Sequence, residues 1–206
     1  MREVNRSAGA KNAVAVQYHF GDRDGLLRAV LAKHWPDVDA RRHAMLDEYE
    51  ASGSGDAGGV RPLAAALVRP LAAKLADDDG GLEYLQVYAE VVNRPASGDE
   101  PEPGPGMSSK PDSIGRWRSL VAPFLEEDAT RLHRRFTAIR FAASELGRRA
   151  ASGRHADDRL FASHLIDLVE ALLIAPTSAE TRRLADERDA SRSSGGRRRA
   201  SSRRPA

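Results

Sequence analysis

The sequence contains no cysteine among its 206 residues, which excludes disulfide bonds, thiolate zinc sites and cysteine nucleophiles. Long apolar runs are also missing, because arginine, aspartate or glutamate interrupts every hydrophobic stretch, so no segment is predicted to span a bilayer. The opening residues, Met1 to Asn5, lack the apolar core of a secretory signal. We therefore expect a soluble cytoplasmic protein that has no membrane partner.

Motifs of catalysis and metal binding are missing too. The six histidines show no metal-binding spacing, and the sequence has no glycine-rich phosphate loop. His155 with Asp157 and Asp158 is more typical of a polar helix start than of a metal site. Adjacent acids such as Glu126 and Glu127 would point in different directions from a helix, which disfavours acid–base catalysis. We expect no metal, no cofactor and no enzymatic activity.

The positive charge is concentrated at the C-terminus. Residues 190–206 hold six arginines and no acid, so the net charge of +2 leaves residues 1–189 with a net charge of −4. The high isoelectric point therefore gives no argument that the body of the chain binds nucleic acid. The arginine, serine and glycine composition predicts a disordered tail over residues 185–206. Such a tail either adds salt-sensitive, sequence-independent affinity for DNA or is simply a solvated terminus.

Apolar residues at helical spacing dominate the rest of the chain. The segment 22–35 has one apolar stripe, which consists of Leu26, Leu27, Val30, Leu31 and His34. We expect Pro36 to end or kink this helix. Small residues and prolines predict flexible linkers at residues 51–59 and 95–115. No run alternates convincingly with period two, so the predicted fold class is all-α.

The opening stretch has the organisation of a helix-turn-helix. A short helix end precedes the small-residue turn at 8–10, and a second helix begins near Asn12. Such a second helix presents its first turns to the major groove of DNA, where Asn12 and Gln17 could bond adenine. Tyr18, His19 and Arg23 lie where this helix ends and the next begins, a position suited to phosphate contact.

The run AGAKNAVAVQYHFGDRDGLLRAVL, residues 8–31, closely resembles the TetR-like (tetracycline-repressor-like) family of bacterial transcriptional regulators. The resemblance depends on the aromatic–His–Phe run at 18–20, on the Gly21 that follows it, and on the basic residue and Leu-Leu pair at 23–27. It implies that Asn12, Ala13 and Gln17 contact base edges, and that Lys11, Tyr18, His19 and Arg23 contact the DNA backbone. It also implies a ligand-responsive repressor, whose partners are a double-stranded DNA operator and a small-molecule effector of unknown identity.

The resemblance divides the chain into a head and a regulatory body. Residues 1–35 would form a truncated helix-turn-helix head with its connecting helix, and residues 36–184 an orthogonal helical bundle for effector binding and dimerisation. In this family the head has three helices, and the first helix and most of the second would lie upstream of the opening stretch. Restoring a helix and a half takes at least about 20 residues at ordinary helix lengths. We therefore expect specific DNA binding to be compromised unless the head is completed. The alternative function is that of an effector-binding and dimerisation module that has lost specific DNA binding.

Two further sets of residues are candidates for sites in the body. Bundle interiors host ligand cavities, and the aromatic residues that could line one are Tyr84, Tyr88, Trp117, Phe124 and Phe141. The alternative for each is plain core packing. Apolar residues at coiled-coil spacing predict an interface across a two-fold axis, formed by Leu132, Phe136, Ile139, Phe161, Leu165, Leu168 and Leu172. The alternative is that both surfaces are covered within one chain.

Overall fold

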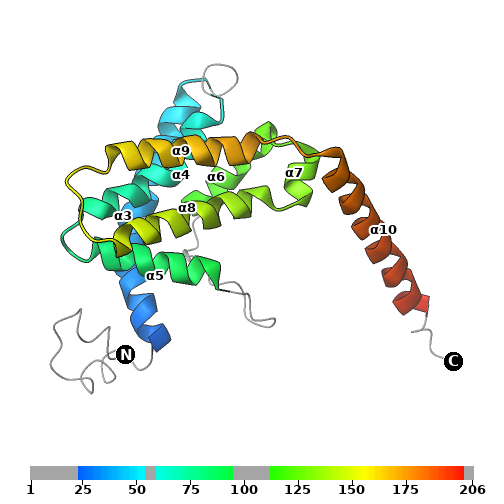
Figure 1. Cartoon of the computed structure of the whole chain (residues 1–206), viewed down its shortest axis with the longest axis horizontal. Coiled ribbons are helices and arrows are strands. Elements are labelled where there is room, and N and C mark those ends of the chain that lie inside the picture. Colours follow the sequence, from blue (N-terminus) through cyan, green and yellow to red (C-terminus); the bar gives the residue numbers. More distant parts are fainter. Residues whose placement is uncertain (1–22, 54–58, 95–111, 202–206) are drawn as a thin grey trace.

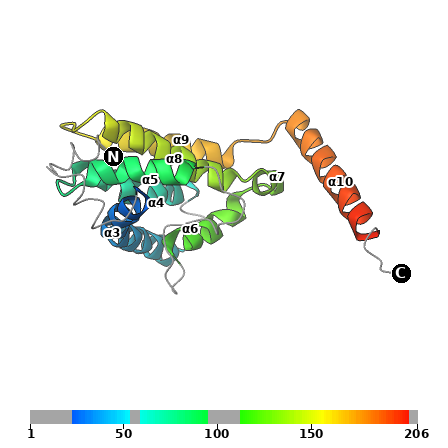
Figure 2. The same cartoon turned by 90° about the horizontal axis from the view of Figure 1, so that it is seen from below.

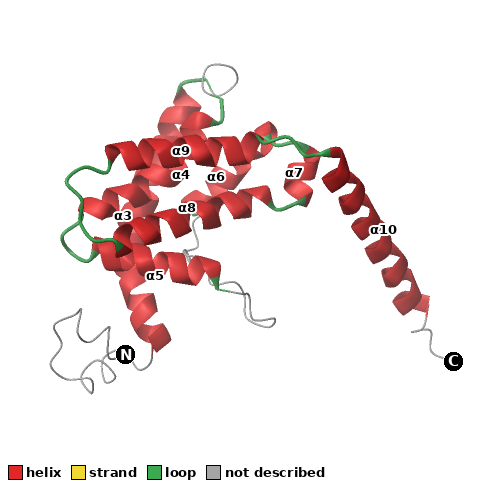
Figure 3. Ribbon diagram, in the orientation of Figure 1, coloured by secondary structure: helices red, strands yellow, loops and turns green. Residues whose placement is uncertain are grey.

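The computed structural model describes residues 23–53, 59–94 and 112–201. These ranges consist of helices joined by turns and contain no strand (Figure 3). The all-α prediction is therefore confirmed, whereas the expected helix-turn-helix falls on residues outside these ranges. The described elements, in chain order, are α3 (Arg23–Ala51), α4 (Arg61–Ala72), the 3-10 turn η1 (Ala73–Ala76), α5 (Gly81–Asn93), α6 (Ser113–Val121), η2 (Ala122–Phe124), α7 (Glu127–Arg131), α8 (Arg134–Ala151), α9 (Arg159–Ile174) and α10 (Ala179–Ser201).

The helices pack around one core. α5 makes its main contacts with α8, and α4 lies against α9 and α3 (Figures 1 and 2). α8 and α9 form an antiparallel pair joined by the turn at Gly153, whose φ of 87° lies in the left-handed region that favours glycine. α3 reaches across the body and contacts α4, α5 and α6. One end of α3 is therefore held in the core, and its other end leads back to the N-terminal segment.

The helix that begins the described chain does not end at Pro36. α3 continues from Arg23 to Ala51 with Pro36 inside it, so the expectation that the helix ends at this proline is wrong, and the predicted boundary at residues 35/36 falls within a helix. A proline removes only one backbone donor, and the buried neighbours His34 and Val38 anchor the helix on either side. Tertiary packing therefore outweighs the local signal.

The C-terminal region differs from its prediction. Residues 185–201 were expected to be disordered, yet they continue α10, which projects away from the body (Figures 1 and 2). Ion pairs hold its first turns to α7, since Arg182 Nε lies 2.6 Å from Asp128 Oδ2 and Arg131 Nη2 lies 2.9 Å from Asp186 Oδ1. Ala185 is buried at this junction. Composition alone missed the pairing of charges between two helices far apart in sequence.

α6 begins inside the stretch that was expected to be a linker. Its N-cap is Asp112, whose side chain accepts a hydrogen bond from the backbone N–H of Gly115 at 2.6 Å. Residues 113–115 are thus helical, and residues 95–111 lie outside the described ranges.

No single helix in the described part of the chain is long and apolar enough to cross a membrane. Only α9 and residues Ala179–Arg192 of α10 meet the length and composition criteria together, and a 60° bend separates them.

Candidate ligand site in the helical core

The predicted DNA contacts fall almost entirely outside the described structure. Lys11, Asn12, Ala13, Gln17, Tyr18 and His19 precede residue 23. Arg23 is the first residue of α3. Their role therefore stays a prediction.

The most unusual group in the described structure is the side chain of Arg42, in the middle of α3. It is fully buried, with 0% of its surface exposed. Its neighbours along the same face are Val38 and Leu46, which are also fully buried. Arginine rarely occupies such a position unless its charge is compensated, because desolvating a guanidinium is costly.

Arg42 is only partly satisfied by hydrogen bonds. Its Nε donates to the carbonyl of Ala66 on α4 at 3.2 Å, and its Nη1 donates to Ser113 Oγ at the start of α6 at 2.9 Å. Its Nη2 is buried and has no hydrogen-bond partner in the described part of the chain. The same holds for the hydroxyl of Tyr84, on α5. Nearly all buried polar groups in proteins are paired, so two such atoms need an explanation.

The nearest acids do not form an ion pair with Arg42. Asp39 accepts a hydrogen bond from the backbone N–H of Ser113 at 2.9 Å, and its second oxygen lies 3.6 Å from His43 Nε2. Asp112 is occupied in capping α6. Among the described residues, no carboxylate lies within ion-pairing distance of the Arg42 guanidinium. Arg42 therefore has no direct acidic partner among these residues, although Asp39 and Asp112 favour its charged form.

Aromatic rings surround this charge. Trp35 lies with its ring centroid 5.7 Å from Arg42 Cζ, and it stacks on Tyr88 at 6.4 Å between centroids. Tyr88 stacks in turn on Tyr84 at 5.9 Å, and the ring of His34 lies 5.1 Å from that of Tyr84. A cation over an aromatic face gains some electrostatic stabilisation, but it remains a donor without an acceptor.

Burial changes the ionisation of these groups in a consistent way. It lowers the pKa of Arg42, while nearby Tyr88, Tyr84 and two aspartates oppose this change; arginine still remains charged. Burial raises the pKa of Tyr84 and of Tyr88, so both phenols keep their protons. Tyr84 can therefore donate a hydrogen bond, and the cluster offers donors and a positive charge at neutral pH.

Lys74 gives a contrast within the same protein. It is also buried, but its Nζ lies 2.8 Å from Asp37 Oδ2 and 2.9 Å from Asp77 Oδ2. Burial lowers its pKa, and the hydrogen bonds to Asp37 and Asp77 outweigh this effect and raise it. The fold therefore supplies directly bonded acids to Lys74, whereas Asp39 and Asp112 act on Arg42 without an ion pair.

The sequence prediction of an effector pocket overlaps this cluster in part. Tyr84, Tyr88 and Trp117 are buried together in the core, and Trp117 Nε1 donates to the carbonyl of Leu63 at 2.7 Å. Phe124 and Phe141 only pack against the core from half-buried positions. Arg42 was not among the predicted site residues. Its spacing could have indicated its burial, since residue 42 lies four positions from Val38 and from Leu46 on an apolar stripe.

The predicted dimer residues differ in exposure. Ile139 and Leu165 are buried within this chain and belong to its own core. Leu132, Phe161 and Leu172 are half-buried. Phe136 and Leu168 remain exposed, at 44% and 39%, and Ile174 at the end of α9 is exposed as well.

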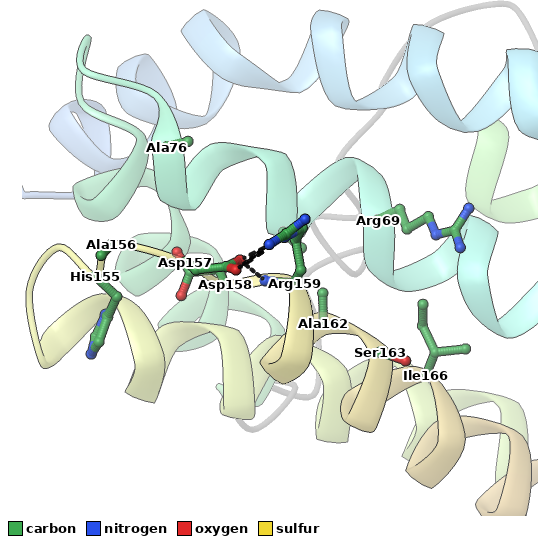
Figure 4. Close-up of a pocket in the computed structure, with 11 residues that line it drawn as sticks. Arg69, Ala76, His155, Ala156, Asp157, Asp158, Arg159, Ala162, Ser163 and Ile166 are labelled. Atoms are coloured by element: carbon green, nitrogen blue, oxygen red, sulfur yellow. Dashed lines mark hydrogen bonds and ion pairs between the residues drawn. The ribbon is translucent and has the colours of Figure 1, made fainter.

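A surface depression of about 490 Å³ lies where the loop before α9 meets α4 and η1 (Figure 4). The acids of its lining are already paired internally, and Arg69 of α4 is exposed at its edge. Asp157 accepts hydrogen bonds from the backbone and the guanidinium of Arg159 at 2.8 Å each, and Asp158 accepts one from Arg149 Nε at 2.8 Å. These contacts fix the start of α9, so the core cluster is the stronger candidate for a ligand site.

No family model, no curated protein and no solved structure matches this chain. Function is therefore inferred from the residues of this chain themselves.

Proposed function

We propose that this chain is a ligand-responsive DNA-binding transcriptional regulator, a repressor similar to the TetR-like family, which acts as a homodimer on a double-stranded operator. The sequence supports this proposal through the helix-turn-helix-like segment that ends in Tyr18-His19-Phe20. The observation that carries the proposal is the buried guanidinium of Arg42, whose Nη2 has no hydrogen-bond partner among the described residues, because a free donor on a charged group inside an aromatic core is typical of a ligand site.

The continuity of α3 supports a link between ligand and DNA. Arg42 lies in the core, and Arg23 begins the same helix directly after the proposed recognition segment. The path between them is about 28 Å at 1.5 Å per residue. A ligand that favours one position of α3 at residue 42 would also change the position of its N-terminal end. In a homodimer this would alter the distance between two recognition segments by a shift of population.

An exposed apolar surface supports the homodimer. Phe136 and Leu168 are exposed large hydrophobic side chains on the adjacent helices α8 and α9. Adjacent helices with an outward apolar stripe can form a four-helix interface with a second copy across a two-fold axis.

DNA binding is tested by selection from a random duplex library with the purified chain. We expect enrichment of duplexes with two-fold symmetry, and loss of that enrichment in Gln17→Ala. Arg159→Ala, on the far surface depression, is the matched control and should leave the selected sequences unchanged.

The second candidate function is a helical effector-binding and dimerisation module without specific DNA recognition. The same Arg42 cluster and apolar surface support it, since neither depends on the N-terminal segment. A chain that dimerises and binds a ligand but enriches no duplex would favour this module over the regulator.

A further inference from the structure

We infer that the core cluster binds the carboxylate of a small organic acid, with Arg42 Nη2 and the Tyr84 hydroxyl as its hydrogen-bond donors. The inference deepens the proposed function, because it names the chemical class of the effector, and it rests on that function only for the claim that binding changes DNA affinity. Both donors are buried, and neither has a hydrogen-bond partner among the described residues.

The kind of anion follows from the charge balance. Arg42 is one cation without an ion pair among the described residues, and Asp39 and Asp112 already act on it without pairing, so a direct partner would carry no more than a single charge. The free groups are a guanidinium nitrogen and a phenol, and two carboxylate oxygens can accept from both. A phosphate carries more charge and more oxygens than one guanidinium edge and one phenol can satisfy, so its burial here would be costly.

The rest of the ligand must be apolar. The surfaces around the two donors are the rings of Trp35, Tyr84 and Tyr88, together with the aliphatic core. Other polar groups near Arg42 are already bonded, as the contacts of Ala66 and Ser113 show. An acid with an aromatic or aliphatic body therefore fits, whereas a sugar or a nucleotide would leave its own polar groups unpaired.

The cluster also gives the buried arginine a role in binding. Without a ligand, the guanidinium costs free energy of desolvation and gains only two hydrogen bonds and one ring contact. A methionine of similar length would remove that cost. We therefore expect Arg42→Met to keep the fold and lose the ligand, which is the reverse of what a purely structural arginine would show.

The experiment measures binding to the full chain by calorimetry and by thermal unfolding at constant ionic strength. The probes are acetate, hexanoate and benzoate, each compared with its neutral amide, and sodium chloride alone. We expect at least one carboxylate to bind and to raise the unfolding temperature, while its amide and chloride do not. Arg42→Met should weaken that carboxylate at least about tenfold, as loss of a charge-assisted hydrogen bond predicts.

Two further variants keep the test decisive. Tyr84→Phe removes one unpaired hydroxyl, so it should fold normally and bind the carboxylate about three- to tenfold more weakly. Lys74→Met removes the buried cation that does have partners, so it should destabilise the chain and leave carboxylate affinity unchanged. Equal binding of carboxylate and amide, equal stabilisation by chloride alone, or full binding by Tyr84→Phe would each overturn the inference.

The binding assay contains no DNA, so a negative result in it is distinct from a failure of the proposed function. Carboxylate binding without selection of a duplex would support the ligand class and remove the regulator. Selection of a duplex without carboxylate binding would support the regulator and remove the ligand class.

Discussion

The tight packing of α8 against α5 at Gly147 predicts the effect of one methyl group. Gly147 lies on the buried face of α8 against α5. A Cβ at this position would lie 2.5 Å from the Cβ of Ala89 and 3.4 Å from the carbonyl oxygen of Leu85. Neither neighbour can rotate away, because one is a methyl on a helix and the other is backbone. We therefore expect Gly147→Ala to push α5 from α8, and α5 carries Tyr84 of the proposed ligand site.

Two opposing terms set the magnitude. Replacing glycine by alanine inside a helix stabilises it by about 1 kcal/mol. Overpacking a tight contact costs typically about 1–3 kcal/mol, and a separation of 2.5 Å belongs to the upper part of that range. The net change is a destabilisation of about 1–2 kcal/mol, which lowers the unfolding temperature by roughly 2–8 °C for a chain of this size.

The assay is thermal and urea unfolding followed by circular dichroism. Ala89→Gly in the same chain as Gly147→Ala should remove the clash, so the two changes should couple by about 1 kcal/mol or more in a double-mutant cycle. Arg148→Ala, at the exposed neighbouring position on α8, is the control and should change stability by less than about 0.5 kcal/mol. An equal or higher unfolding temperature for Gly147→Ala would refute the inferred contact.

Three other predictions concern pH, assembly and the last helix. Burial, and then the charge of Lys74, lowers the pKa of His34 below 6.5, so the unfolded chain binds more protons at this residue than the folded chain and the free energy of unfolding should fall as the pH drops through 6.5. Urea unfolding from pH 7 to 5 should show a shallower pH dependence of this free energy in His34→Gln, and an identical slope would contradict the prediction. Leu168→Glu should convert the expected dimer to a monomer in light scattering at micromolar concentration, whereas Leu184→Glu on α10 should not, and a wild-type chain that is already monomeric would exclude the dimer. The hydrogen bond from Arg182, then the charges of Arg182 and Arg131, lowers the pKa of Asp128, which shows that the charged carboxylate is bonded to α10. Asp128→Asn should therefore speed hydrogen exchange over residues 179–192 and leave α8 protected, whereas unchanged exchange would show that this pair does not hold α10.

The fold class was predictable because helical spacing is a local property. The apolar positions of α9 recur every three or four residues, and the structure buries Leu165, Val169 and Leu173 as that spacing requires. Leu168 and Ile174 on the same helix remain exposed. Spacing does not say which side meets the same chain and which meets another molecule, so the predicted interface mixed core residues with exposed ones.

The candidate site could be predicted only in part. The aromatic residues Tyr84, Tyr88 and Trp117 were identifiable because large rings in a helical body belong to a core or a cavity. Arg42 was not, since a charged residue on an amphipathic helix is normally placed at the solvent side. Its burial depends on Ala66 and Ser113, which come from other helices and accept its hydrogen bonds only after the chain has folded.

By itself, the sequence determined the helical class, the absence of thiol chemistry and the expectation of a DNA-binding segment, because composition and periodicity are encoded residue by residue. Tertiary structure alone decided that α3 continues through Pro36, that α10 is held by charge pairs to α7, and that the charge of Arg42 is buried without an acid. Each of these depends on which groups meet across the fold, and the free energy of burying or pairing a group is fixed by those distant neighbours and not by its position along the chain.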